Sequence, residues 1–322
     1  MKNVLVTGVA GFIASNLICY LVKKYPDYFF LGIDKISYCS SIKNFEEIKD
    51  YDNFEFVKAD FTNLEFMDYI FSKYKIDTVL HLGAYTHVDM SFGDSIIYTQ
   101  NNVVGTHVLL ETAKKHKIKL FVNMSTDEVY GSSSEQSNEQ SLIQPTNGYA
   151  ATKAAAEQLV RSYFHSFKLP IIIVRGNNVI GPKQYPEKLL GKFILKILNN
   201  EPLTIQGSGE QKRSFLYVDD VCKALDIVMH KGAIGQTYNI GCKEEHSVLE
   251  VTEKLVNYFK NNDENRREAS IIFIEDRPFN DQRYFISCEK IETLGWKQEI
   301  FFEEGLKRTI EWYVNNQKYF KE

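Results

Sequence analysis

The sequence predicts an α/β protein in which a doubly wound parallel sheet carries a smaller mixed α/β domain. Short apolar runs alternate with stretches whose apolar residues recur at helical spacing, which is typical of βαβ units and of a parallel sheet covered on both faces. After Arg175 this alternation stops and a segment marked by Gly and Pro follows. The expected strands are Val4–Thr7, Phe29–Ile33, Phe54–Val57, Thr78–Leu82, Leu120–Met124 and Ile171–Val174, and the expected helices are Phe12–Lys24, Leu64–Tyr74, Ser95–His116 and Tyr149–Phe167.

The segment after Arg175 predicts the smaller domain. Because Ser214–Gly241 is expected to return to the main sheet, the division is not a single cut. Residues 1–176 with about 212–240 form the first domain, and about 177–211 with 241–322 form the second. The polar segment 131–148 is either a solvated excursion or a lid. The expected helices here are Lys188–Asn199, Asp219–His230, Val248–Lys260 and Glu303–Asn315, and the expected strands are Thr237–Ile240 and Ile271–Ile274.

Composition places the chain among ordinary globular proteins. Of its 322 residues 44% are hydrophobic and 25% charged, which excludes wholesale disorder. A formal net charge of -4 argues against a dominant nucleic-acid surface. The five cysteines are scattered without a C-x-x-C pair, and the first residues enter a strand rather than a signal peptide. No apolar run approaches a membrane span, so we expect no membrane partner. We also expect a cytoplasmic protein and no metal.

A glycine-rich turn joins the first expected strand to the first expected helix. In Thr7–Ala14, T-G-V-A-G-F-I-A, Gly8 permits a tight turn, and Gly11 lets backbone N–H groups approach a pyrophosphate that the helix N-terminus attracts. Asp34 ends the second strand, where its carboxylate can bind a ribose 2′-hydroxyl and repel a 2′-phosphate; otherwise it is only a strand-end residue. The pattern predicts a Rossmann-type site for NAD rather than NADP, with Asp60 at the adenine edge.

Tyr149 and Lys153 lie four residues apart, on one face of an expected helix. A free phenol has a pKa of about 10 and is a poor base at neutral pH. A neighbouring Lys153 ammonium and a cationic nicotinamide ring would both favour the phenolate, which makes Tyr149 a candidate acid/base for a sugar hydroxyl. Alone, a Y-x-x-x-K pair is a common surface coincidence; after a dinucleotide turn it is a stronger signal.

Polar residues follow the fifth expected strand, in the run S-T-D-E-V-Y-G. Thr126 can orient a substrate beside Tyr149, since ligands of an open α/β sheet meet the carboxyl ends of its strands. Asp127 and Glu128 form an adjacent acidic pair, which is either an ordinary acidic helix start or a catalytic feature. Elimination of water requires one group to remove a carbon-bound proton and another to protonate the departing hydroxyl, and two carboxyls in unequal environments can divide those roles.

Six motifs occur in order along nearly the whole chain: T-G-x-x-G-F-I, H-V-D at His87–Asp89, S-T-D-E-V-Y-G, Y-x-x-x-K, P-E-K-L at Pro186–Leu189, and D-R-P…D-x-R-Y at 276–284. Together they resemble the extended short-chain dehydrogenase/reductases, and within them the nucleotide-sugar 4,6-dehydratases. Shorter sequence motifs, such as R-G-N-N-V at Arg175–Val179, are similar to the UDP-glucose 4,6-dehydratase domain of plant-type rhamnose synthases. Tyr85 and Met90 depart from that pattern, at positions expected near the sugar pocket.

The resemblance implies an internal redox cycle with net loss of water. Tyr149, supported by Lys153 and Thr126, takes the proton of the hydroxyl on carbon four while the hydride passes to NAD. Glu128 then removes the proton on carbon five, Asp127 protonates the hydroxyl that leaves carbon six, and the hydride returns to carbon six. The implied reaction converts UDP-glucose to UDP-4-keto-6-deoxyglucose, a first step toward a deoxysugar such as rhamnose.

The resemblance also implies binding residues at the matching positions. Without the family pattern, Lys188 would equally suit a solvated helix face and Arg213 a surface ion pair. In the family, two arginines contact the diphosphate, for which a planar guanidinium is suited. Cofactor contacts are implied for Gly8, Gly11, Phe12, Ile13, Asp34, Lys35, Asp60, Phe61, Leu82, Ala84, Asn101, Ser125, Tyr149 and Lys153. Nucleotide-sugar contacts are implied for Thr86, His87, Asn178, Lys188, Leu189, Thr204, Gln206, Arg213, Arg277 and Asn280.

Three alternatives stay open. The substrate can be dTDP-glucose instead of UDP-glucose. A nucleotide-sugar 4-epimerase or decarboxylase uses the tyrosine and lysine but lacks the acidic pair. A non-catalytic NAD-sensing protein on the same scaffold would not need Thr126, Tyr149 and Lys153 together. By analogy with the family, we also expect a homodimer formed through Ser95–His116 and Tyr149–Phe167.

Overall fold

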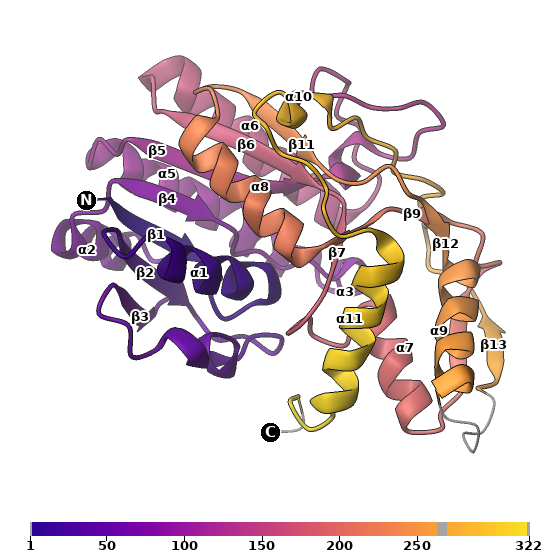
Figure 1. Ribbon diagram of the computed structural model, residues 1–322. Helices are drawn as coiled ribbons and strands as arrows, with labels where there is room; N and C mark the ends of the chain where they lie inside the picture. The colour runs from indigo at the N-terminus through magenta and orange to yellow at the C-terminus, as the bar shows by residue number, and fades with distance from the viewer. Residues whose placement is uncertain (1, 263–268, 321–322) are drawn as a thin grey trace.

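The chain is built around a parallel sheet. The computed structural model, which describes residues 2–262 and 269–320, contains a seven-stranded sheet in the order β11-β6-β5-β4-β1-β2-β3 (Figure 1). The direction of the strand order reverses between β1 and β4, and ligands of open α/β sheets bind at such a point. The expected doubly wound Rossmann-type sheet is therefore confirmed. Its strands are β1 Asn3–Thr7, β2 Phe29–Asp34, β3 Phe54–Lys58, β4 Thr78–His81, β5 Leu120–Thr126, β6 Ile171–Gly176 and β11 Thr237–Ile240.

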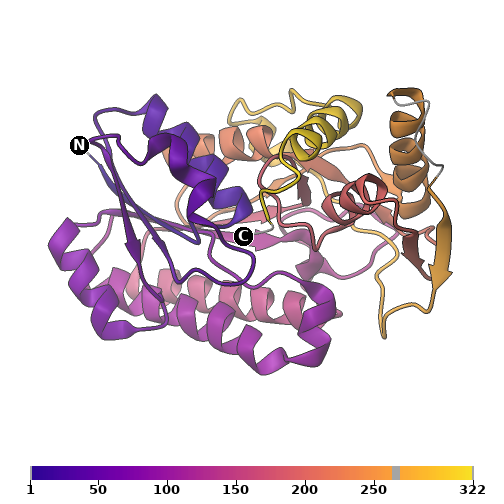
Figure 2. The ribbon, with the colours of Figure 1, turned by 90° about the horizontal axis from the view of Figure 1, so that it is seen from below.

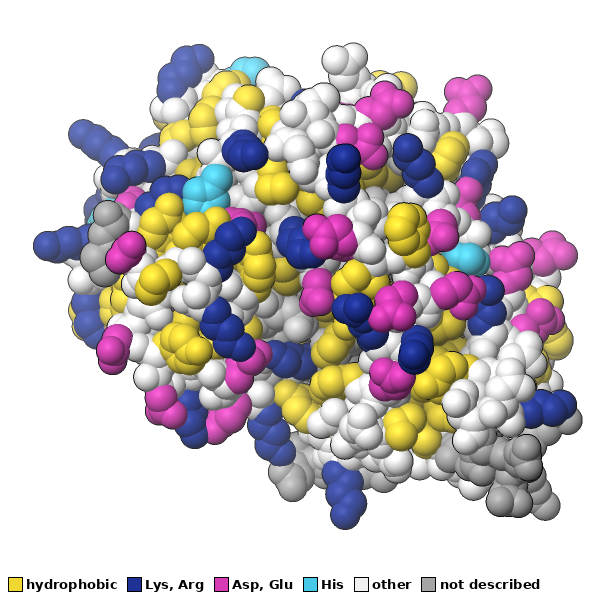
Figure 3. All heavy atoms as spheres, in the orientation of Figure 1, with side chains coloured by type: hydrophobic (Ala, Val, Ile, Leu, Met, Phe, Trp, Pro, Cys, Tyr) yellow, Lys and Arg dark blue, Asp and Glu magenta, His cyan; other side chains and the backbone are white. Residues whose placement is uncertain are grey.

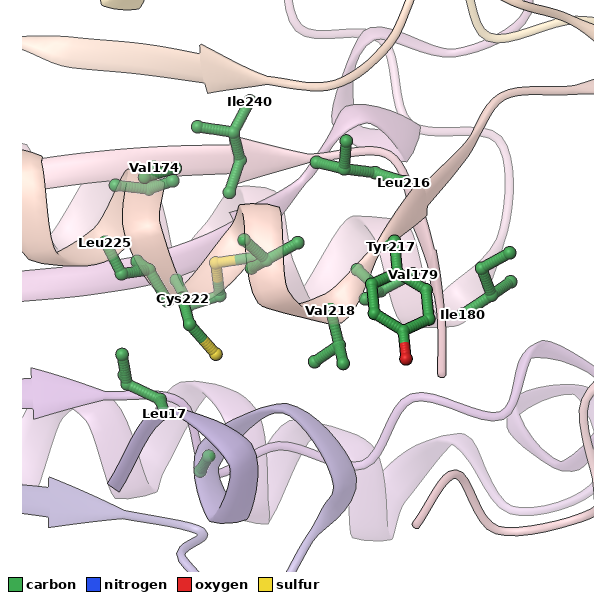
Figure 4. Packing of buried hydrophobic residues seen from close by; sticks show 14 of the residues in the cluster. Leu17, Val174, Val179, Ile180, Leu216, Tyr217, Val218, Cys222, Leu225 and Ile240 are labelled. Carbon is green, nitrogen blue, oxygen red and sulfur yellow. The ribbon is translucent and has the colours of Figure 1, made fainter. Parts of the chain in front are cut away.

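Helices cover both faces of this sheet (Figure 2). Helices α1 and α8 pack together on one face, while α2, α5 and α6 form the opposite layer. Figure 4 shows Leu17 of α1, Leu225 of α8 and Val174 of β6 among the buried hydrophobic side chains on this face, and each of the three is at most 1% exposed. The helices are α1 Phe12–Lys24, α2 Leu64–Tyr74, α5 Gly105–Lys115, α6 Gly148–Phe167 and α8 Val218–Lys231.

The smaller, mixed part of the chain lies beside the carboxyl ends of the strands (Figure 1). It contains three two-stranded sheets, in which β7 pairs with β10, β8 with β13 and β9 with β12. Strand β11 pairs with β6 of the main sheet, so the expected return of Ser214–Gly241 to that sheet is confirmed. The elements are β7 Asn178–Ile180, α7 Leu189–Leu198, β8 Leu203–Gln206, β9 Lys212–Arg213, β10 Phe215–Tyr217, β12 His246–Ser247, α9 Val248–Asn262, β13 Ile271–Ile274, α10 Glu289–Glu292 and α11 Phe302–Asn315.

The long helix expected over Ser95–His116 is not continuous. It is divided into α4 Ser95–Tyr98, a π-helical segment η2 Thr99–Val104, and α5. The π-helical turn buries Asn102, whose amide accepts from Tyr85 N and donates to Thr152 Oγ1 of α6, at 2.9 and 3.0 Å. The hydrophobic period alone does not separate a π-helical turn from an α-helix, because both present one apolar face. Further short elements that the periodicity did not predict are η1 Ile42–Ile48, α3 Val88–Gly93 and η3 Asp127–Tyr130.

The surface carries charges of both signs. On the face shown in Figure 3, basic and acidic side chains are interspersed, as the formal net charge of -4 suggests. All five cysteines are free thiols. Among the described residues, no helix combines the length and the hydropathy needed to cross a bilayer.

Candidate active site

A cavity of about 350 Å³ opens where the carboxyl ends of the central strands meet the smaller part of the chain. Thr126 ends β5 and Gly176 ends β6, and both line the cavity, as does Tyr149 at the start of α6. Every residue expected to contact the nucleotide sugar also lines it. These are Thr86, His87, Asn178, Lys188, Leu189, Thr204, Gln206, Arg213, Arg277 and Asn280.

The glycine-rich turn has the geometry that a dinucleotide pyrophosphate requires. Gly8 has a φ of +72°, and a Cβ at this position would lie 2.6 Å from Gly83 Cα, so only glycine fits. Helix α1 begins without a side-chain cap at Gly11, which leaves its first N–H groups to a ligand. Phe12 and Ile13, in the first turn, line the cavity.

Two further observations bear on the cofactor. The hydroxyl of Ser125 is buried, has no hydrogen-bond partner and lines the cavity together with Leu82 and Ala84. Asp34 accepts from Ala10 N at 3.1 Å on one oxygen and from Ile36 N at 2.7 Å on the other, and the Ser40 side chain also hydrogen-bonds to this carboxylate. Its strand-end role is therefore real, yet a carboxylate with three donors keeps acceptor capacity that a ribose hydroxyl can use. The residues present thus fit a dinucleotide.

Other expected cofactor residues lie outside the cavity wall. Lys35 Nζ donates to Asn101 Oδ1 at 2.8 Å and lies 3.8 Å from Asp60 Oδ2. The ring of Phe61 is 5% exposed and packs in the core, where a Cβ on Gly105 would come within 2.3 Å of it. Only the Phe61 backbone is therefore left to contact a ligand.

The phenol of Tyr149 is almost completely buried at 7% exposure. Burial and the charge of Glu128 raise the pKa of Tyr149, although a hydrogen bond with Thr126 opposes them. Lys153 Nζ donates to Met124 O at 2.6 Å, and burial lowers the pKa of Lys153 to about 8. The expectation that Lys153 favours the phenolate stays a prediction, since an ammonium that donates to one carbonyl keeps its charge and two further N–H donors.

Asp127 is the buried member of the acidic pair. It is 3% exposed, and burial together with the charge of Glu128 raises its pKa to about 7. Asn177 Nδ2 donates to Asp127 Oδ2 at 2.6 Å, and the hydroxyl of Thr126 lies 3.2 Å from Asp127 Oδ1. Asp127 itself does not line the cavity, which sets it apart from the other catalytic candidates.

Glu128 faces the cavity and is half-buried. Asn147 Nδ2 donates to Glu128 Oε2 at 3.0 Å, and Tyr284 Oη approaches the same oxygen at 3.4 Å. Tyr284 Oη also donates to Asp281 Oδ2 at 2.5 Å. The two adjacent carboxyls therefore have unequal surroundings, which is the property that shared acid and base work requires.

Two guanidinium groups converge at the far end of the cavity. Asn280 Oδ1 accepts from Arg277 Nη2 at 2.6 Å and from Arg213 Nη2 at 3.2 Å. Arg277 Nε is buried without a hydrogen-bond partner, and Asp89 Oδ1 is 3.3 Å from Arg277 Nη1. Two cations that share one neutral acceptor and retain a free donor suit a diphosphate.

The residues that depart from the plant-type pattern do not form the cavity wall. The ring of Tyr85 lies 4.6 Å from Lys35 Nζ, and Met90 is 47% exposed on α3. Their chain neighbours Ala84, Thr86 and Asp89 line the cavity, and their expected place near the sugar pocket stays a prediction. Lys188 Nζ donates to Thr86 O at 2.7 Å and thereby joins two segments of the chain that line the cavity.

Several polar residues of the site were not singled out from the sequence. Asn147, Asn177, Asp281 and Tyr284 all contact the acidic pair or its partners. Each lies in or next to a motif, but no spacing rule indicates which carboxylate it meets. The segment 131–148 contributes no residue to the cavity wall, and its role as a lid stays a prediction. Within the described ranges, no group of His, Cys, Asp and Glu side chains is arranged to hold a metal ion.

Comparison with known proteins agrees with this geometry. A parallel sheet with a strand-end dinucleotide turn and a Tyr-x-x-x-Lys helix defines the extended short-chain dehydrogenase/reductase class. The chain belongs to the family described as GDP-mannose 4,6 dehydratase, whose model matches residues 5–309. The expected resemblance to nucleotide-sugar 4,6-dehydratases is thereby confirmed.

Individual relatives are similar along nearly the whole chain. A trifunctional UDP-glucose 4,6-dehydratase, 3,5-epimerase and reductase of Arabidopsis thaliana is 46% identical over 99% of this chain, which spans 48% of that relative. The dTDP-D-glucose 4,6-dehydratase of Mus musculus is 47% identical over 98% of this chain and 89% of its own. The dTDP-glucose 4,6-dehydratase of Streptomyces venezuelae, solved with NAD, has a TM-score of 0.94 at 32% identity, over 99% of this chain and 98% of its own.

Proposed function

We propose that this chain is an NAD-dependent hydro-lyase that converts UDP-glucose to UDP-4-keto-6-deoxyglucose. The observation that carries the proposal is the acidic pair beside Tyr149, in which Asp127 is buried and Glu128 faces the cavity. A 4-epimerase or decarboxylase has no use for such a pair, and a protein that only senses NAD has no use for Tyr149 either. The pair therefore favours dehydration.

The proton steps are assigned to side chains of this chain. Thr126 and Tyr149 orient the hydroxyl on carbon four, and Tyr149 takes its proton. Glu128 is held through Oε2, and we assign Oε1 to remove the proton on carbon five, whose acidity rises once carbon four is a ketone. Asp127, with a pKa raised to about 7, retains a proton near neutrality for the hydroxyl that leaves carbon six.

When bound, NAD supplies the acceptor for the hydride of carbon four and returns that hydride to carbon six. Gly8 and Gly11 would hold its pyrophosphate, Asp34 its ribose, and Ser125 would donate toward it from the cavity wall. The pKa of Tyr149 is raised in this structure, so we propose that the phenolate forms only when a cationic ring lies beside it.

The preference for the uridine nucleotide is the finer part of the proposal. It is supported by the R-G-N-N-V wording at Arg175–Val179 and by similarity to the Arabidopsis relative. The mouse relative, named for dTDP-glucose, is equally similar at 47% identity. Discrimination between the two nucleotides depends on contacts to a ribose 2′-hydroxyl and to a base methyl. We propose that Thr204 and Gln206 of β8, which line the cavity, make contacts of this kind.

Purified protein incubated separately with UDP-glucose, dTDP-glucose and GDP-mannose tests the proposal. We expect a 4-keto-6-deoxy product from UDP-glucose at the highest kcat/KM. Production from dTDP-glucose alone would move the assignment to that nucleotide. A 4-epimer, or no product from any of the three, would contradict dehydration itself.

The double variant Asp127→Asn with Glu128→Gln tests the roles of the two carboxyls. We expect it to abolish loss of water while some 4-ketoglucose still forms, because Tyr149 is unchanged. Trapping that ketone with borodeuteride and locating the label by mass spectrometry measures the partition. Dehydration at the wild-type rate would disprove the roles assigned here.

Four further parts of the proposal concern the whole protein. We propose a homodimer formed through residues 95–116 and 149–167. We also propose that the chain is divided into a dinucleotide-binding domain and a nucleotide-sugar-binding domain, as expected above. We also propose a cytoplasmic location, which five free thiols support, since disulfides are rare in reducing compartments. A place in rhamnose formation would follow from the same product.

A further inference from the structure

This inference deepens the proposed dehydration and rests on it. We propose that Asn177 is a positioning residue that keeps the carboxyl proton of Asp127 on Oδ1, the oxygen beside Thr126. In this assignment Asn177 does not react. It decides where the proton of the general acid resides before the sugar hydroxyl leaves.

The orientation of the Asn177 amide is fixed by the backbone. Cys242 N donates to Asn177 Oδ1 at 3.1 Å, and a backbone N–H can only donate. The other end of the amide, Nδ2, must therefore be the group that faces Asp127 Oδ2 at 2.6 Å. Asn177 is 6% exposed and Cys242 5%, so water has little access to either bond.

This orientation assigns the proton to one oxygen of Asp127. An amide Nδ2 has two N–H donors and no acceptor, so a proton on Asp127 Oδ2 would point at another donor. Oδ2 is thus an acceptor whether the carboxyl is ionised or not, and the acid proton resides on Oδ1. Thr126 Oγ1 donates to that oxygen at 3.2 Å when the carboxyl is ionised, and it becomes the acceptor when Oδ1 carries the proton. Thr126 lines the cavity.

A glycine on a neighbouring strand leaves the room that Asn177 needs. Gly241 directly follows β11, and a Cβ at that position would lie 1.9 Å from Asn177 Oδ1 and 2.7 Å from its Cγ. The chain therefore approaches the amide more closely than any other residue type would permit. A methyl group at Gly241 would displace Asn177, which lines the cavity, and its nearest neighbours are Asn177 and Ile286 rather than Asp127, which provides a second, independent perturbation.

The other groups around Asp127 set its ionisation together with Asn177. Glu128 lies next to it in the same turn, Tyr149 faces it from α6, and the cation of Arg213 reaches it from β9. Burial and Glu128 raise the pKa of Asp127, whereas the Asn177 hydrogen bond and Arg213 lower it. Removing the Asn177 donor should therefore raise this pKa further.

The test compares Asn177→Ala and Gly241→Ala with the wild-type protein. Infrared spectra across pH give the titration of the protonated Asp127 carboxyl, which is identified as the band that Asp127→Asn removes. We expect both variants to shift this titration upward by about one pH unit, the size expected for loss of a hydrogen bond to a charged group. The alkaline limb of kcat should move in the same direction, because a general acid must be protonated. Gly93→Ala is the matched control, since a Cβ there would meet nothing within 4 Å.

The two readouts separate this inference from the proposed function. An unchanged Asp127 titration in Asn177→Ala would overturn the inference, even if activity fell. A shifted titration in a protein whose wild type makes no 4-keto-6-deoxy sugar would leave the placement of the proton intact and refute the dehydration. If Asn177→Ala does not fold, Gly241→Ala decides by the same measurement, and an unshifted band there also overturns the inference.

Discussion

At the scale of single residues, the site depends on two neighbours that occupy different surroundings. Asp127 and Glu128 belong to the short 3-10 turn η3, in which consecutive side chains diverge. One side chain turns into the protein toward Asn177, and the other turns to the cavity and Asn147. A difference in burial, rather than in chemical type, therefore separates the two carboxyls.

This burial has a consequence for stability that Asp127→Asn should reveal. The pKa of Asp127 is raised to about 7 in the fold, mainly by burial, whereas an unfolded aspartate titrates near 3.9. A raised pKa means that the wild-type carboxyl stabilises the fold at acid pH and that this stability is lost as pH rises toward 7. We expect Asp127→Asn to gain about 1–3 kcal/mol in free energy of unfolding over the wild type between pH 5 and pH 8. Denaturant unfolding at both pH values measures this, with the exposed Asp50→Asn as control, and a pH-independent difference would contradict it.

At the scale of elements, the N-terminus of α6, the helix that carries Tyr149, lies against Glu128, the proposed base. Asn147 is the N-cap, because its Oδ1 accepts from Ala150 N at 2.8 Å while its Nδ2 donates to Glu128. One side chain thus stabilises the helix and orients the carboxylate that we propose as the base. The two roles can be separated by substitution.

Asn147→Ser should keep the cap and lose the donor to Glu128, whereas Asn147→Ala should lose both. We expect Asn147→Ala alone to lower the free energy of unfolding by about 1 kcal/mol, the usual worth of a cap. Both variants should lower kcat by about tenfold or more, because a misplaced base reacts poorly. Asn63→Ser is the matched control, since Asn63 caps α2 in the same manner far from the cavity. A normal kcat in Asn147→Ser would show that the Glu128 contact has no catalytic importance.

The break between η2 and α5 permits another test. At Gly105, the first residue of α5, a Cβ would lie 2.3 Å from the Phe61 ring, so the helix packs on that ring more closely than alanine allows. We expect Gly105→Ala to lower the free energy of unfolding by about 1–3 kcal/mol through overpacking. Gly93→Ala, which meets open space, should leave it unchanged or slightly raise it. Equal effects of the two substitutions in thermal or denaturant unfolding would exclude close packing as the reason for Gly105.

At the scale of the whole molecule, local motifs account for the parts that the sequence predicts, and long-range contacts for the parts that it does not. Thr126, Asp127 and Glu128 are contiguous and follow a buried strand, so their place at the sheet edge follows from the parallel topology. One partner of Glu128 does not follow from the topology of the sheet. Tyr284 lies 156 residues further along the chain and reaches Glu128 only through the packing of the smaller part. The same reason explains why the contact between Asn177 and Cys242, which joins β6 to β11, was not expected.

The pocket lining shows the same dependence on tertiary structure. The sequence motifs predict Arg277 as a phosphate ligand, but they do not reveal that Asp89, 188 residues earlier, lies against it. They also place Lys153 beside Tyr149 by helical spacing, whereas the ammonium in fact bonds to a carbonyl of β5. Spacing along a helix fixes which side chains are near one another but not which acceptor each selects.

The proposed homodimer is a property of the whole molecule. Helices α5 and α6 lie on the outer side of one face of the sheet (Figure 2), and Ile96 and Val104, on the segment that precedes α5, are 66% and 48% exposed. A stable dimer requires roughly 1,200–2,000 Å² of total buried surface, and apolar side chains at its centre contribute most of the binding. If two copies meet through this face, Ile96→Glu with Val104→Glu would bury like charges against one another and should convert the dimer to monomers. Sedimentation velocity at micromolar concentration measures this, with Leu142→Glu as the control because Leu142 is 77% exposed on the segment 131–148. A monomeric wild type would exclude this interface. A double variant that stays dimeric would also exclude it, since a desolvated pair of like charges costs more than an interface of ordinary size can offset.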